Sequence, residues 1–363
     1  MGLLIELFDY APLPHVNGLQ SVEVYEGQSA QFSCQVKYAE SVKYQTSVDG
    51  INWVDVAGAT NSTYTISNTV RTTHDSKMYR VVASNRYGQR ISNSVMLNVW
   101  NPLALGSGLV AWMDPTFGVF VERTGASAST PSSNNGLVGT WRARNGSINA
   151  VAAADNQRGI YRTTGLNNAH CIDTSAGYYT YNFSGLNSAF RNAKYGYMFI
   201  GGTHVTTNQG QLRFSIPEAA RFASIYYGST LAVVGKYLNS NSGFHMTTSV
   251  GTSFTTNEVF IFGTEMIWYE AEGGPIAGYT GYSNFPRYIR KNSSRTQLSH
   301  MGKPQLDSYN ITGLSHDVDN SQVYSDLRGR IGHIVIASPN TKLTEQEMDK
   351  IEGFIKYKIN LTF

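Results

Sequence analysis

The stretch SVDGINWVDVAGATNSTYTI, residues 47–66, limits the possible folds more than any other part of the chain. Asp49 and Gly50 form a dipeptide that favours a tight hairpin turn, because such a turn needs a positive φ and glycine adopts one without steric cost. Polar and apolar residues alternate on both sides of this dipeptide, which is typical of strands with one buried face. Residues 42–48 and 51–56 are therefore predicted to be the two strands of a β-hairpin.

The alternation continues over residues 18–100, with about seven short strands and turns about every 8 to 12 residues. This pattern predicts an immunoglobulin-like (Ig-like) β-sandwich. Asp75 and Tyr79 are spaced as in the tyrosine corner of that fold, and Val81 stands where a second cysteine would follow. Cys34 is then expected to face Val81 across the two sheets, so that apolar packing replaces a disulfide. Trp53 is expected to be packed in the core or half-buried.

The remaining residues predict a second, larger all-β domain. With 363 residues the chain is long enough for two domains, and its low charged fraction (15%) with 23 tyrosines and 16 phenylalanines favours strands over helices. We expect an N-terminal docking arm at 1–17, the Ig-like domain at 18–100, a linker at 101–108, and a jelly-roll sandwich at 109–363.

One helix is predicted at the end of the second domain. Thr344 is a suitable N-cap, with Glu347 three residues later in the capping-box arrangement. Met348, Ile351 and Ile355 form an apolar stripe that would pack against the sandwich.

Two segments resemble known families. Residues 47–66 resemble the Ig-like modules of bacterial surface proteins and tailed-phage virion proteins, and the resemblance continues through YRVVASNRYG and SNSVMLNV. The segment LVAWMD and the C-terminal strand and helix resemble concanavalin A-like (LamG-type) lectin/glucanase domains. The matching positions there are Trp112, Asp114, Gly329, Ile331, Ile334, Ile336, Leu343, Thr344, Glu347, Ile351, Ile355 and Lys358. Together the resemblances imply a tailed-phage virion protein.

Several partner classes are not expected. The net charge of +3 comes from scattered lysines and arginines, so no basic stripe indicates nucleic acid. The first residues carry Glu6 and Asp9 and no basic leader, and their apolar run is too short to span a bilayer, so we expect neither a signal peptide nor membrane insertion. Cys34 and Cys171 fall in different predicted domains, which argues against a disulfide framework.

The N-terminal residues are the candidate docking arm. Leu4, Phe8 and Tyr10 alternate with polar residues and could add as an edge strand to another virion protein. The alternative is an unordered tail without a partner.

Loop tyrosines are the candidate carbohydrate-binding residues, because sugar sites combine exposed aromatic rings with polar donors. The candidates are Tyr178, Tyr179, Tyr181, Tyr279, Tyr282 and Tyr288. The alternative is that these rings pack under loops or against neighbouring subunits.

Asp317, Asp319 and Asn320 offer oxygen ligands for calcium, the one cofactor considered. The EF-hand glycine and glutamate are absent, and the alternative is a solvated Asx turn.

No catalytic residues are predicted. A glycosidase needs two carboxylates on one face, about 5 to 9 Å apart. In the segment GTEMIWYEAEGG only Glu270 and Glu272 share a strand face, and the Glu-x-Asp-x-x-Glu motif of laminarinase-like enzymes is missing.

These observations lead to one functional expectation. The chain is expected to be a non-enzymatic structural protein on the surface of a tailed-phage virion, as a head decoration, fibre or tail appendage, assembled in the host cytoplasm. As a homo-oligomer or in many copies it would bind host-surface glycans through avidity. The alternative is a bacterial cell-surface or secreted carbohydrate-binding adhesin.

Overall fold

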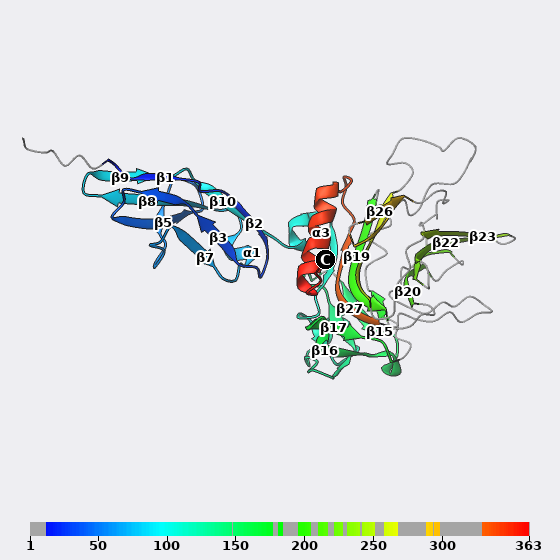
Figure 1. The fold of residues 1–363 in the computed structure, drawn as a ribbon. Helices are drawn as coiled ribbons and strands as arrows, with labels where there is room; N and C mark the ends of the chain where they lie inside the picture. Colours follow the sequence, from blue (N-terminus) through cyan, green and yellow to red (C-terminus); the bar gives the residue numbers. More distant parts are fainter. Residues whose placement is uncertain are drawn as a thin grey trace, which may run out of the picture. The chain divides into compact units, whose positions relative to one another are not determined.

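The computed structural model describes residues 12–146, 148–176, 181–183, 195–204, 210–216, 221–227, 231–239, 242–250, 258–267, 288–292, 294–297 and 329–362. The chain divides into two compact units, Met1–Asn101 and Pro102–Phe363 (Figure 1). In β20 to β23 of the second unit the backbone alone is described.

The first unit is an Ig-like β-sandwich. Its elements are β1 (His15–Asn17), β2 (Val22–Tyr25), β3 (Ala30–Ser33), β4 (Gln35–Lys37), β5 (Ser41–Ser47), β6 (Val54–Asp55), β7 (Thr63–Ile66), α1 (Arg71–His74), β8 (Lys77–Asn85), β9 (Gly88–Ile91) and β10 (Val95–Trp100). One sheet has the order β2-β10-β8-β5-β6, with β9 also on β8, and β3 pairs with β7. The neighbours β10, β8 and β5 correspond to strands G, F and C of the Ig fold.

Apolar packing fills the centre of this unit. Tyr44 on β5 is fully buried and lies where Ig domains place a tryptophan, and Val81 on β8 is also fully buried. Cys34 packs at the edge of the same cluster, with its Sγ 3.8 Å from Tyr44 Oη. Trp53 is half-buried: its Nε1 donates to the Gly50 carbonyl at 3.0 Å.

The hairpin at residues 42–56 exists, but its turn is wider than predicted. The strands end at Ser47 and resume at Val54, so residues 51–53 belong to the loop. The Asp49 carboxylate accepts the backbone N–H groups of Ile51 and Asn52, which holds the chain in an Asx-type loop in place of a two-residue turn. Gly50 has the positive φ that the sequence predicts.

The predicted arm boundary at residue 17 also changes. β1 pairs with β4, and the Pro12 carbonyl accepts a hydrogen bond from Asn85, so residues 12–17 are part of the sandwich.

The second unit is a larger β-sandwich with one helix near its C-terminal end. Its elements are η1 (Pro102–Gly108), β11 (Leu109–Met113), β12 (Val119–Phe120), η2 (Gly125–Ser127), β13 (Leu137–Val138), β14 (Thr140–Arg142), β15 (Asn149–Ala152), η3 (Asp155–Gln157), β16 (Gly159–Leu166), β17 (Ala169–Asp173), β18 (Tyr181–Phe183), β19 (Tyr195–His204), β20 (Gly210–Ile216), β21 (Arg221–Tyr227), β22 (Leu231–Asn239), β23 (Ser242–Val250), β24 (Val259–Ile267), β25 (Tyr288–Lys291), β26 (Ser294–Gln297), β27 (Gly329–Ala337) and α3 (Glu345–Lys358).

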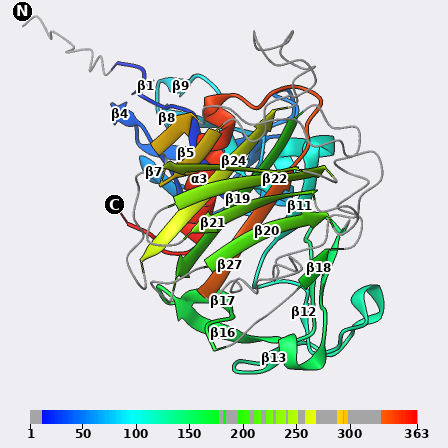
Figure 2. The same cartoon turned by 90° about the vertical axis from the view of Figure 1, so that its right-hand side faces the viewer.

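The large sheet of this unit has the order β13-β16-β17-β27-β19-β24-β25-β26, and β11 also pairs with β27. β27 therefore lies in the middle of the sheet, between β11 and β17 on one side and β19 on the other. Smaller sheets are formed by β12-β14-β15-β18 and by β20-β21-β22-β23. Figures 1 and 2 show the β20–β23 sheet on the side of the large sheet opposite α3.

The helix α3 packs on the large sheet as its sequence pattern predicts. Thr344 and Glu347 form the capping box, and Met348, Ile351 and Ile355 are fully buried. Gly201 lets the helix approach, because a Cβ there would lie 2.5 Å from Ile355 Cγ2. The prediction of an all-β chain with an Ig-like sandwich, a larger sandwich and a C-terminal helix is confirmed.

The segment expected to be a linker belongs to the second unit from Pro102 onward. Residues 102–108 form η1, which contacts β11 and β27. Pro102 and Gly108 are buried, and the Gly108 carbonyl accepts a hydrogen bond from Ser338 N at 2.7 Å.

Candidate functional site

A β-bulge in the centre of the large sheet sets the position of His333. The register between β19 and β27 shifts between Ile200 and Gly202, and β27 has one extra residue at this point. Such a bulge redirects a side chain out of the regular alternation. The His333 ring lies against Phe354 of α3, with the two ring centroids 5.9 Å apart in an edge-on arrangement.

His333 belongs to a buried polar cluster at the end of β11. Trp112 Nε1 donates to His333 Nδ1 at 3.3 Å, which leaves the ring proton on Nε2, 3.8 Å from Asp114 Oδ1. The same Asp114 oxygen accepts the backbone N–H and the hydroxyl of Thr116, at 2.8 and 2.7 Å. Asp114 Oδ2 accepts from Arg144 Nη1 at 2.7 Å. His333 Nδ1 and both carboxylate oxygens of Asp114 are therefore engaged within the protein.

The electrostatics of the cluster keep His333 neutral and Asp114 charged. Burial lowers the pKa of His333 to about 4, and the nearby Asp114 carboxylate offsets this only in part. Burial alone would raise the pKa of Asp114, but His333, the Thr116 hydrogen bonds and Arg144 hold that pKa below its ordinary value. Because Asp114 stays charged and His333 stays neutral, the Asp114 carboxylate can hold the Arg144 guanidinium in position.

The cluster reaches the surface at Phe117 and Arg144, here called the anchored pair. The Arg144 guanidinium carbon lies 4.9 Å from the centroid of the Trp112 ring and 5.1 Å from that of Phe117. Arg144 is exposed and Phe117 keeps 42% of its surface exposed. The anchored pair thus offers an apolar ring and planar hydrogen-bond donors, held in place by the buried Asp114.

Most of the predicted site residues lie outside the described residues. This holds for the tyrosines 178, 179, 279 and 282, for the calcium candidates Asp317, Asp319 and Asn320, and for the arm residues Leu4, Phe8 and Tyr10; Tyr288 lies in β25, where only its backbone is described. Glu270 and Glu272 also lie outside. These predictions stay predictions.

Tyr181 does not fit the sugar-binding prediction. It is 3% exposed, and its hydroxyl donates to the Val138 carbonyl at 2.7 Å and accepts from Gly159 N at 2.9 Å. Because the ring and the hydroxyl are both used inside the sandwich, the carbohydrate-binding role assigned to Tyr181 is wrong.

The sequence singled out Trp112 and Asp114 as family-like positions but missed Phe117, Arg144 and His333. Arg144 and His333 carry no local signal, because they reach Asp114 from distant parts of the chain, whereas Phe117 lies three residues after Asp114 and donates its backbone N–H to the Asp114 carbonyl. Within the described parts of the chain, no group of three or more His, Cys, Asp and Glu side chains is placed to hold a metal ion. No helix among the described residues is long and apolar enough to cross a membrane.

Both cysteines are free thiols. Cys34 is half-buried in the first unit, where burial raises its pKa against a lowering contribution from Tyr44. Cys171 is buried in the second unit, and burial together with Asp173 raises its pKa to about 12. Both side chains are protonated at neutral pH and act as small apolar groups.

Comparison with known proteins finds one family match, and it falls within the first unit. Residues 17–101 match the model of a family described as a domain of unknown function, DUF8696. No curated protein matches the chain. Among solved structures, titin M4 in its trigonal form is 19% identical with a TM-score of 0.21, over 25% of this chain and 99% of that one. The CBM40 of the Ruminococcus gnavus IT-sialidase, bound to α2,3-sialyllactose, is 12% identical with a TM-score of 0.35, over 50% of this chain and 96% of that one. At these scores the likenesses carry no inference about function.

Proposed function

We propose that the chain is a non-enzymatic structural protein of a tailed-phage virion, exposed on the head or tail, and that its second unit binds glycans on the host surface. The observation that carries the glycan-binding part is the anchored pair. An exposed aromatic ring beside a fixed guanidinium provides the apolar face and the directed donors that a sugar ring needs.

The buried cluster supports a binding role over a catalytic one. Asp114 and His333, the groups with acid–base chemistry, are almost fully buried and contact Arg144, Thr116 and Trp112. Their contacts fix the orientation of Arg144 and leave the surface to Phe117 and Arg144.

The two free thiols support assembly inside a cell. An Ig-like core normally gains stability from a disulfide between its sheets, and here Tyr44 and Val81 fill that space while Cys34 stays reduced. A domain of this kind folds fully in a reducing compartment, where virion proteins are made. Residues 1–11 are proposed to dock the chain onto the particle.

Glycan binding is tested with two matched pairs of substitutions in the full chain. Phe117→Ala and Arg144→Gln should each weaken binding on a glycan array by about tenfold, since each removes an interaction of about 1 to 2 kcal/mol. The control pair is Tyr87→Ala and Arg86→Gln on the first unit, where the guanidinium carbon lies 4.8 Å from the ring centroid and Tyr87 is 43% exposed. Equal loss in both pairs, or no glycan binding by the unaltered chain, would contradict the proposal.

The virion part is tested on particles. Mass spectrometry of gradient-purified phage should find the chain in every preparation, and antibody labelling should place it on the outside. A chain found only on bacterial cells or in their medium would favour the adhesin alternative.

A further inference from the structure

A second polar cluster lies on the large sheet, where β16, β17 and β27 are neighbours. We call Arg162, Asp173 and Arg330 the Asp173 cluster. Arg162 Nε and Arg330 Nε approach the same oxygen, Asp173 Oδ2, at 3.3 and 3.6 Å. Two guanidinium groups from different strands thus converge on one carboxylate.

Strand register explains why these residues meet. Asp173 pairs directly with Arg330 across β17 and β27, and with Ile160 across β16 and β17. Arg162 is two residues beyond Ile160, so it lies on the same face of the sheet as Asp173. Figure 1 shows β16 and β17 beyond the lower end of α3. Asn360, just after the helix, donates a side-chain hydrogen bond to the carbonyl of Asn167, which lies between these two strands.

The carboxylate is fixed from its other side as well. Asp173 Oδ1 accepts the backbone N–H of Ser175 at 3.0 Å and its hydroxyl at 2.6 Å. The Asp173 side chain is 6% exposed, whereas those of Arg162 and Arg330 are 36% and 44% exposed. The cluster therefore combines a buried, negatively charged carboxylate with two partly exposed, positively charged guanidinium groups.

Each arginine is oriented by a second contact. Arg330 Nη1 donates to the Gly165 carbonyl at 2.9 Å, and Arg162 Nη1 donates to Asn135 Oδ1. Nε and Nη1 of each arginine are thus engaged within the protein, and each side chain still keeps more than a third of its surface exposed. Two positive charges against one negative charge leave one net positive charge, which matches a single anionic group.

We propose that the Asp173 cluster binds the carboxylate or sulfate group of an acidic glycan, an inference that rests on the proposed glycan-binding function and names its ligand class. Planar guanidinium groups match the geometry of a carboxylate or sulfate better than lysines do. The buried Asp173 holds both arginines in place before the ligand arrives, which lowers the entropy cost of binding. Asn134, which accepts the backbone N–H of Thr163 beside Arg162, places an amide next to the cluster for the sugar hydroxyls.

The test uses the full chain on an array of neutral, carboxylated and sulfated glycans, followed by calorimetry with the best acidic glycan and its neutral counterpart. The unaltered chain should prefer the acidic form by about tenfold or more, and the preference should fall as salt is raised. Arg162→Gln and Arg330→Gln should each remove most of that preference, while Arg90→Gln on the exposed strand β9 should not change it.

Conservative variants separate binding from folding. A single substitution leaves Asp173 one arginine partner, and circular dichroism checks that the sheet is intact. Arg330→Lys keeps the charge but loses the planar group, so it should lose part of the preference and keep its salt dependence. If both glutamine variants fail to fold, the preference for the acidic glycan is measured in Arg330→Lys instead. A preference equal to that of the unaltered chain would then overturn the proposal.

The outcomes also separate this inference from the proposed function. Equal binding of neutral and acidic glycans, unaffected by the arginine substitutions, would overturn the Asp173 cluster and leave glycan binding standing. Binding of no glycan would overturn both. Inorganic phosphate or sulfate that binds as tightly as the acidic glycan would reduce the cluster to an anion site and overturn its role in glycan recognition.

Discussion

At the scale of single residues, His333 makes the second unit sensitive to acid. Its pKa is lowered to about 4 in the fold, whereas an unfolded histidine has a pKa of about 6.5. The unfolded state therefore takes up a proton first as the pH falls. The contribution of His333 to the free energy of unfolding is fully present above about pH 6.5. It falls by about 3 kcal/mol in total as the pH is lowered to about 4.

Four charged or titratable groups near His333 also influence its pKa. Asp114 raises this pKa, whereas Lys358, Arg144 and His170 lower it. His333→Asn should remove the loss between pH 6.5 and pH 4, because asparagine can still accept from Trp112 Nε1 and does not titrate. Urea unfolding of both chains at a series of pH values measures this. The same slope in both chains would show that another group causes the acid sensitivity.

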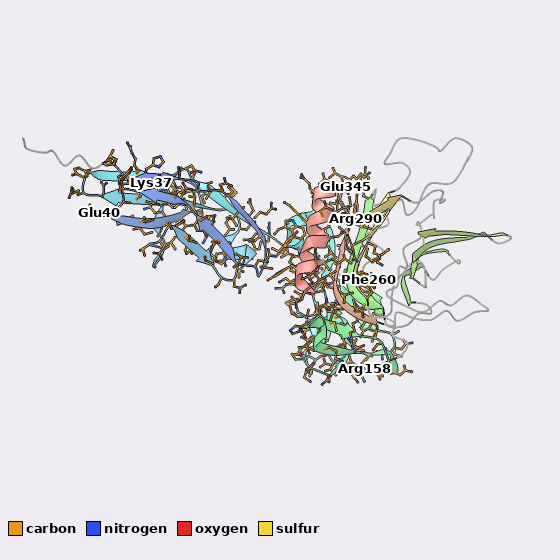
Figure 3. The ribbon with its side chains drawn as sticks, in the orientation of Figure 1. Lys37, Glu40, Arg158, Phe260, Arg290 and Glu345 are labelled. Atoms are coloured by element: carbon orange, nitrogen blue, oxygen red, sulfur yellow. The ribbon has the colours of Figure 1, made fainter. Side chains whose placement is uncertain are left out.

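At the scale of secondary-structure elements, a network of ion pairs around the buried Arg290 joins β25 to α3. Arg290 donates to Glu352 at 2.5 Å, to Glu345 at 2.6 Å and also to Asp349, all on the helix. Figure 3 shows Arg290 and Glu345 side by side. Arg290 and Glu352 are each 2% exposed, so their charges are compensated by each other within the protein.

Arg290→Met should destabilise the second unit by about 3 to 5 kcal/mol, because it leaves the Glu352 carboxylate buried without its cation. The double variant Arg290→Met, Glu352→Leu should recover most of this loss, since an apolar pair of similar size fills the same space. Thermal and urea unfolding of the two variants complete the comparison. A double variant no more stable than the single one would indicate that the network adds specific stability beyond charge compensation.

The elements show which features the sequence could predict. The Gly50 backbone conformation and the Thr344 capping box were predicted correctly because their signals are local. The position of His333 depends on a bulge between β19 and β27, which are more than a hundred residues apart in the chain, and the Arg290 network joins residues 55 to 62 positions apart. Tyr181 was misread because its neighbours suggest a loop, while its burial comes from Val138 and Gly159 on other strands.

At the scale of the whole molecule, the proposed docking role can be tested by truncation. Removal of residues 1–11 keeps Pro12 and β1, which belong to the first unit, so the truncated chain should stay folded and bind glycans as before. It should no longer be incorporated into particles. Quantitative mass spectrometry of purified phage measures this, and unchanged incorporation would show that docking uses another surface.

The place of β27 in the sheet has a consequence for biosynthesis. This strand is made after β11, β17 and β19, yet it lies between them in the sheet. Until Ala337 has left the ribosome, the strands on either side of it expose backbone edges and apolar faces that other nascent chains could pair with. Completion of the large sheet must therefore wait until β27 has been made, and slow elongation through the codons that precede it would lengthen the period in which chaperones are needed.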